Sequence, residues 1–202
     1  MKHFIFYPIV FFTFVNDVSG QCLYDATLDE NWKEKIRSIA PEKATFDYKE
    51  QKKVLVFTLN TGFYHWVKPH TTEMVKILGE KSDAFLIYES NDLEMMESEK
   101  LAQFDVLFLN NTNSKPNYRN LFVDKLEEIS NLDSVSLWNK ALQLEQNIFD
   151  FVRNGGGLFM IHGSNTTFNN SMEFSRLTGG SFDYHPPQQA IQIRLVDANH
   201  PL

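Results

Sequence analysis

Cysteine is almost absent from this sequence. The 202 residues contain one cysteine, Cys22, so no disulfide can form within the chain. Because Cys22 lies near the N-terminus, ahead of the first predicted helix, a cysteine nucleophile within the folded domain is also excluded. Stability must therefore come from a hydrophobic core, and a composition of 43% apolar and 14% aromatic residues is sufficient for one domain of this size.

Positive charge is also scarce. The chain has 19 lysines and arginines against 26 acidic residues, a net charge of −7, and its longest basic run is Lys52-Lys53. A nucleic-acid interface needs a concentrated basic surface, so we expect no nucleic-acid partner. The acidic balance favours solubility and indicates no specific partner.

Two common catalytic loops are missing. Ser164 follows His162 and Gly163 without the framing glycines of a G-x-S-x-G elbow. The three glycines at 155–157 precede a predicted strand instead of following one, so they end a helix and do not cradle a phosphate. The sequence therefore excludes a serine hydrolase with this elbow and a phosphate-loop enzyme.

One long apolar run occurs, at the N-terminus. Residues 4–15 are apolar and follow Lys2 and His3, and small residues at 18–20 offer a cleavage site. This pattern is typical of a secretory signal, and the run is too short to span a bilayer comfortably. We expect residues 1–20 to be a signal peptide on an exported protein that is not integral to a membrane; the alternative is an uncleaved anchor.

The rest of the chain divides into an N-terminal part, 21–52, and a domain, 53–202. In the first part, Thr27 and Glu30 fit a capping box, and the predicted helix stops before Pro41. In the domain, predicted strands and helices alternate. Strands are predicted at 54–57, 84–88, 105–110, 158–161 and 190–196, and helices at 69–78, 142–153 and 173–177, with a helical signal inside 114–139. We therefore expect an α/β fold in which helices cover both faces of a parallel sheet.

Three histidines lie where strands of such a sheet begin or end. His65 follows the first strand, His162 follows the fourth, and His185 lies in the loop before the last. The carboxyl ends of parallel strands meet at one edge of the sheet, so all three can line one site there. Three imidazoles can hold zinc or another divalent metal, or can include a general acid or base. The plain alternative for each is a hydrogen-bonded loop residue.

Candidate polar partners are fewer. Asp183 precedes His185 by two residues, and it either orients an imidazole, binds a sugar hydroxyl or simply forms a turn. Glu89 follows the second strand, and the polar run at 110–113 can hydrogen-bond a polyol or merely shape a turn.

Several segments together resemble the trehalose-utilisation (ThuA-like) family. The resemblance covers residues 53–202 and rests on VLVFT at 54–58 leading to GFYH at 62–65, FDVLFLN at 104–110, GGGLFMIH at 155–162, GGSFDYHP at 179–186 and DANHP at 197–201. It implies a class I glutamine amidotransferase-like, flavodoxin-like, three-layer fold. The resemblance also implies that His162 occupies the place of the amidotransferase nucleophile, so glutamine hydrolysis is not expected. It further implies that the substrate class is trehalose and related disaccharides.

The sequence departs from the family pattern at three places. Family members commonly carry an acidic residue shortly after the elbow histidine, where this chain has Asn165, Thr166 and Thr167. The segment 114–139 resembles an insertion that forms a lid or contact surface, and the family domain continues beyond its His-Pro motif, so we expect a domain truncated at its C-terminus.

These observations lead to two functional hypotheses, besides a third in which the expected truncation leaves a structural remnant. In the first, an exported domain acts on or binds a disaccharide or an oxidised sugar through His65, His162 and His185, with Asp183 beside them. The one cofactor considered is a divalent metal such as zinc. In the second, the domain is a non-catalytic carbohydrate-binding or partner module of a polysaccharide-utilisation system. A homo-oligomer is left open in both.

Overall fold

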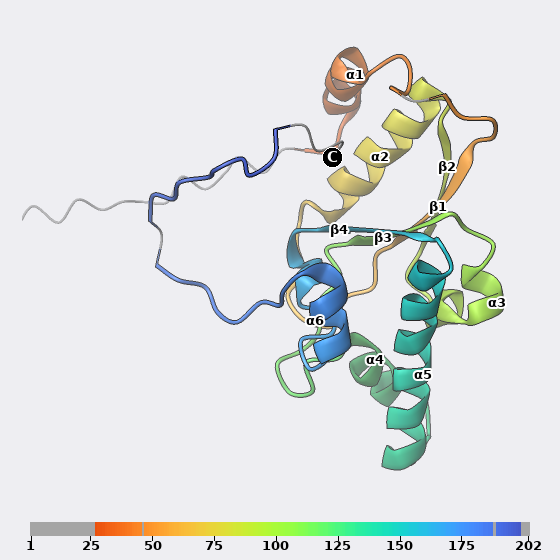
Figure 1. Cartoon of the computed structure of the whole chain (residues 1–202), viewed down its shortest axis with the longest axis vertical. Helices are drawn as coiled ribbons and strands as arrows, with labels where there is room; N and C mark the ends of the chain where they lie inside the picture. The colour runs from red at the N-terminus through yellow and green to blue at the C-terminus, as the bar shows by residue number, and fades with distance from the viewer. Residues whose placement is uncertain (1–26, 46, 188, 199–202) are drawn as a thin grey trace, which may run out of the picture.

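Four parallel strands form the centre of the protein. The computed structural model describes residues 27–45, 47–187 and 189–198, so the predicted signal peptide, Cys22 and His200 lie outside the described residues. The sheet has the order β2-β1-β3-β4, and every neighbouring pair is parallel (Figure 1). Its strands are β1 (Lys52–Phe57), β2 (Phe85–Ser90), β3 (Val106–Asn110) and β4 (Gly157–Ile161). The expected parallel α/β fold is confirmed.

Helices cover both faces of this sheet. They are α1 (Glu30–Ile39), α2 (Lys68–Ser82), α3 (Ser98–Leu101), α4 (Leu121–Ile129), α5 (Ser134–Arg153) and α6 (Met172–Thr178), with the short 3-10 helices η1 (Leu93–Met96) and η2 (His162–Asn165). Helix α2 lies on one face, and α3, α4, α5 and α6 pack against the other (Figure 1). Among the described helices, none is long and apolar enough to cross a membrane. The result is the three-layer arrangement of a flavodoxin-like fold.

Strand β1 shows why the apolar runs form buried strands. Successive side chains point to opposite faces of a sheet, and both faces are covered here. Leu55 and Phe57 pack into the core beneath α5, whereas Val54 and Val56 pack on the α2 side. All four side chains are buried, with exposed fractions of 8% or less.

The four apolar residues at 158–161 predict a buried strand at the centre of the sheet, and β4 differs from this prediction. The helix before it ends as expected, with Asn154 as the C-cap of α5 and Gly155 at a φ of 98°. However, β4 lies at an edge of the sheet, and the side chain of Phe159 is 58% exposed. An apolar run indicates a strand, but its neighbours in the sheet depend on pairing with distant segments, which the run does not encode.

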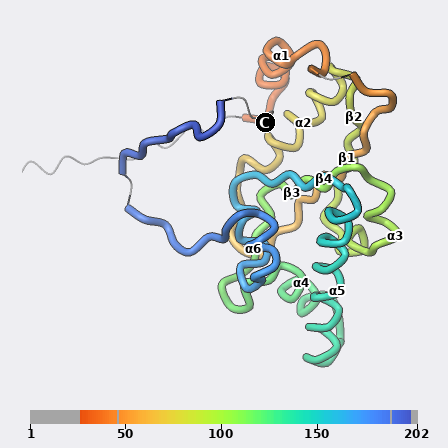
Figure 2. Tube along the Cα trace, in the orientation of Figure 1, coloured from red at the N-terminus to blue at the C-terminus, as the bar shows by residue number. Residues whose placement is uncertain are grey.

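The predicted strand at 190–196 is wrong. The described residues between 189 and 198 form no strand, and Ile193 is 89% exposed. Figure 2 shows the chain leaving the folded body after α6. Alternating apolar residues provide one face that could be buried, but a strand also needs a partner for its backbone hydrogen bonds, and none of the four described strands pairs with this segment.

Two further local expectations are corrected. The N-cap of α1 is Asp29, whose side chain accepts a 2.8 Å hydrogen bond from the backbone N–H of Trp32, so the capping box at Thr27 is not formed. The segment 114–139 is no separate lid, because Leu121 and Phe122 of α4 are at most 1% exposed within the main core. A segment with its own helical periodicity can be a core element as readily as a surface one.

Candidate functional site

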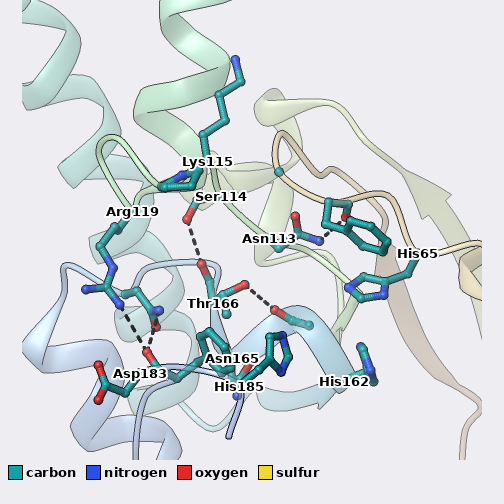
Figure 3. A pocket seen from close by; sticks show the side chains of 16 residues that line it. His65, Asn113, Ser114, Lys115, Arg119, His162, Asn165, Thr166, Asp183 and His185 are labelled. Carbon is teal, nitrogen blue, oxygen red and sulfur yellow. Dashed lines mark hydrogen bonds between the residues drawn. The ribbon is translucent and has the colours of Figure 1, made fainter. Parts of the chain in front are cut away.

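A pocket of about 870 Å³ lies at the carboxyl end of the sheet. Its walls come from the loops that follow β1, β3 and β4 and from the segment at 182–185 (Figure 3). The lining residues are Gly62, Phe63, His65, Asn113, Ser114, Lys115, Pro116, Arg119, His162, Gly163, Asn165, Thr166, Asn169, Phe182, Asp183 and His185. All four predicted site residues therefore line the same pocket. His65 and His162 reach it from the carboxyl ends of β1 and β4, where parallel strand ends converge, whereas Asp183 and His185 reach it from the segment after α6.

His65 and His162 are in direct contact in this pocket. Their ring centroids are 4.4 Å apart and the rings meet edge to face at 77°. Gly163 makes the approach possible, because a Cβ at that position would lie only 3.0 Å from Nε2 of His65. The ring of Phe63 also meets His65, at 4.9 Å. The loops after β1 and β4 thus bring two imidazoles together.

The backbone of His162 adopts a left-handed conformation with a φ of 48°. Strand β4 ends at Ile161 and η2 begins at His162, so the chain turns sharply at this residue. A left-handed conformation costs a residue with a Cβ about 1–2 kcal/mol relative to glycine. Such strained residues cluster at functional sites, where the surrounding structure holds them in place.

His65 is the more buried of the two imidazoles, and its pKa is lowered. Burial is the main cause, and the positive charges of His162 and Lys68 add to it. The ammonium group of Lys68 donates hydrogen bonds to Asn60 and, at 2.7 Å, to the backbone oxygen of Thr58. His65 is consequently neutral at pH 7, and a neutral imidazole can accept a proton or bind a metal.

Asp183 and His185 line the pocket, and among the described residues neither forms a hydrogen bond or a ring contact with His65 or His162. His185 meets the ring of Phe182 at 4.8 Å, and within the described residues Asp183 hydrogen-bonds to no histidine. In this same part of the chain, no three His, Cys, Asp or Glu side chains are close enough together to hold a metal ion. The three-histidine metal site and the role of Asp183 remain predictions.

The other candidates have structural partners. Glu89 pairs with Lys76 at 2.9 Å, outside the pocket lining. Asn110 is buried and donates to the hydroxyl of Thr72 at 2.9 Å. Of the polar run at 110–113, Asn113 alone lines the pocket. Most of this run therefore fixes the loop after β3.

Ser164 is likewise committed to the fold. It is fully buried, donates a 2.7 Å hydrogen bond to the backbone oxygen of Leu109, and accepts one from the backbone N–H of Thr112. Its hydroxyl joins η2 to the end of β3, and it is unavailable as a nucleophile. This agrees with the missing elbow motif.

Two residues that shape the pocket were not found from the sequence. Asp124, on α4, is 1% exposed, and its Oδ2 accepts hydrogen bonds from the hydroxyl of Thr61 and the backbone N–H of Lys115. Arg119 lines the pocket wall between these loops. Both lie in the segment expected to be an insertion, and no periodicity or motif distinguishes them.

A comparison with protein-family models matches residues 53–202 to ThuA, described as trehalose utilisation. The chain belongs to the ThuA family. The resemblance drawn from the ordered motifs is thereby confirmed, and family membership relates this domain to trehalose utilisation. No curated protein and no solved structure gives a significant match to the chain.

Proposed function

We propose that this ThuA domain binds a disaccharide or a related oxidised sugar in the pocket and transfers a proton on it. The observation that carries the proposal is the contact between the lowered-pKa imidazole of His65 and the strained, pocket-facing His162 at the carboxyl end of the sheet. A pocket of about 870 Å³ is large enough for two sugar rings. Asn, Ser and Thr side chains in its walls supply hydrogen-bonding groups for hydroxyls.

The proposed chemistry follows from the neutral imidazole of His65 and from its contact with His162. Neutral His65 accepts a proton from the carbon next to the carbonyl of an oxidised sugar, which leaves an enolate, and it returns the proton to the other face of that carbon or to the enolate oxygen. His162, exposed beside it, contacts the sugar and fixes the geometry for this transfer. The exposed ring of Phe63 at the pocket offers a flat apolar surface for a sugar ring.

Calorimetry and a turnover assay with trehalose and its oxidised form test this proposal. Substitution of His162 by alanine should weaken binding and abolish turnover, and His65→Gln should abolish turnover while retaining more of the affinity. Glu89→Gln is the control, because Glu89 lies at the end of β2 but outside the pocket. Unchanged affinity and turnover in the His162 variant would overturn the proposal.

A second candidate function is binding without catalysis. In the described part of the chain, no carboxylate hydrogen-bonds to His65 or His162, and Asn165 and Thr166 line the pocket where the family commonly has an acidic residue. A base that lacks an orienting acid is a weaker catalyst. Sugar binding without any turnover, lost in the His162 variant, would support this function over the first.

We also propose that the protein is exported. The support is the pattern of residues 1–20, in which a basic start, an apolar run and small residues follow one another. N-terminal sequencing of protein recovered from the exported fraction of the expressing cells should begin near Gln21. Recovery of the uncleaved chain from the cytoplasm would contradict export.

A further inference from the structure

We propose that the pocket contains an anion subsite at Arg119, so that its preferred ligand is a sugar carrying a carboxylate or a phosphate. This inference rests on the proposed sugar-binding function and specifies the ligand class of the same pocket. Arg119 lies on the wall opposite the side from which His65 enters (Figure 3). One sugar can therefore reach both the imidazole pair and the guanidinium group.

The guanidinium group of Arg119 is largely uncommitted. It donates one hydrogen bond, 3.3 Å long, to the backbone oxygen of Phe182, and within the described ranges it forms no ion pair. The neighbouring Lys115 differs, because its ammonium group pairs with Glu128 at 2.7 Å and extends away from the pocket (Figure 3). A guanidinium group has five N–H donors, and most of those of Arg119 stay available to a bidentate anion.

The backbone of Arg119 is fixed in place. Its N–H donates to the oxygen of Lys115 at 3.3 Å, and its own carbonyl oxygen accepts from the N–H of Asn170 at 3.2 Å. Its φ of 54° lies in the left-handed region, which is unfavourable for arginine. The next residue, Asn120, is fully buried and caps α4. The side chain therefore starts from a fixed backbone position, so binding an anion has to order the side chain alone.

The charges around the pocket favour an anion. Lys115 and Arg119 line the pocket, and the charge of Lys68 lies close enough to His65 to contribute to its lowered pKa, although the whole chain carries −7. Asp183 is the one carboxylate in the lining. Figure 3 shows it directed away from the histidine pair. An acidic group between Arg119 and the imidazoles therefore meets more positive than negative charge.

Calorimetry with three matched ligands tests this inference. The ligands are trehalose, a disaccharide of the same size that carries a carboxylate, and one that carries a phosphate. We expect at least one acidic sugar to bind about 10-fold or more tightly than trehalose, since hydrogen bonds between charged groups are roughly twice as strong as neutral ones. Its affinity should fall as salt is raised, whereas that of trehalose should not. The stronger of the two acidic ligands identifies the anion.

Substitutions of Arg119 distinguish the effect of its charge from an effect on the structure of the loop. Arg119→Asn removes the charge and tolerates the left-handed backbone, so it should abolish the preference for the acidic sugar and leave trehalose affinity within about 2-fold. Arg119→Lys keeps the charge but loses bidentate geometry, and should retain part of the preference. Arg176→Gln, on α6 and outside the pocket lining, is the matched control.

The outcomes distinguish this inference from the function on which it rests. Equal affinity for trehalose and both acidic sugars would overturn the anion subsite and leave the sugar site standing. An acidic preference that survives in Arg119→Asn would also overturn it. Absence of binding by all three sugars would overturn the subsite and the proposed function together. A further gain in acidic-sugar affinity in Asp183→Asn, which removes the like charge, would support it.

Discussion

The hydroxyl of Thr61 donates a 2.6 Å hydrogen bond to Oδ2 of Asp124, a carboxylate that is 1% exposed. The same oxygen accepts a 2.6 Å hydrogen bond from the backbone N–H of Lys115. One buried carboxylate on α4 therefore joins the loop after β1 to the loop after β3. Both loops line the pocket, so the position of Gly62 and Phe63 relative to Ser114 depends on this pair.

Replacement of Asp124 by alanine should lower the free energy of unfolding by about 1–3 kcal/mol, because two donors lose their acceptor. It should also weaken sugar binding, since the two loops are no longer joined. Urea unfolding and calorimetry measure these effects. Asp47→Ala, at an exposed position, is the control and should stay within about 0.5 kcal/mol. Equal stability of the two variants would contradict the role given to Asp124.

Replacement of Gly62 by alanine should destabilise the protein through a steric clash. A Cβ at this position would lie 2.4 Å from the backbone oxygen of Ser114 and 2.5 Å from Oδ1 of Asn113. Backbone cannot move as easily as a flexible side chain, so we expect a loss of about 1–3 kcal/mol. Gly180→Ala is the control, because nothing lies within 4 Å of its added Cβ. Thermal unfolding of both variants measures this loss of stability, and equal stability of the two would contradict the clash.

The strained backbone of His162 predicts an unusual order of stabilities. With a φ of 48°, this position suits glycine better than alanine. His162→Gly should therefore unfold with a free energy about 1 kcal/mol higher than His162→Ala. Neither variant should retain the sugar-dependent activity. A glycine variant that is less stable than the alanine variant would show that the residue is not held in this conformation in solution.

The pKa of His65 should respond to its charged neighbours. Burial is the largest cause of its lowering, followed by His162 and then Lys68. His162→Ala and Lys68→Gln should each raise the pKa of His65 towards its usual value, and neither should restore it fully while the ring stays buried. An NMR titration of the imidazole signals measures this. A pKa that falls further in His162→Ala would contradict the electrostatic account.

Glu145 predicts a pH-dependent difference in stability. Burial raises the pKa of this carboxyl, although hydrogen bonds from Ser171 and Asn120 oppose the shift. As pH rises through the unfolded-state value of about 4.3, the unfolded chain loses this proton first, so wild type loses stability until the folded-state pKa is passed. Glu145→Gln removes this pH-dependent loss of stability.

The stability of Glu145→Gln relative to wild type should therefore increase from about pH 4 upwards and then level off. Urea unfolding across this range tests the expectation. Glu50→Gln, at an exposed position, supplies the control, and its difference from wild type should vary little with pH. A Glu145→Gln difference that is flat across the range would contradict the raised pKa.

The strands and helices of the core could be predicted because their signals are local. The apolar run at 54–57 is long enough for a strand buried on both faces, and the glycines at 155–157 end α5 where they stand. Pairing is not local. The position of β4 at the edge, and the absence of a strand at 190–196, depend on which segments meet in space.

The composition of the pocket was partly predictable for the same reason. His65 and His162 line it because loops at the carboxyl ends of parallel strands converge, whereas His185 reaches it from the segment after α6. Arg119 and Asp124 could not be found, because each acts through partners far away in the chain. Arg119 hydrogen-bonds to Phe182, and Asp124 to Thr61.

The sequence by itself determined the family, the parallel α/β fold and the edge of the sheet that carries the pocket, since apolar periodicity, glycine stops and ordered motifs are all properties of short segments. The tertiary structure alone decided the contact of His65 with His162, the lowered pKa of His65 and the exposure of Phe159. Each of these depends on the distance between segments that are remote in the chain, and packing sets that distance.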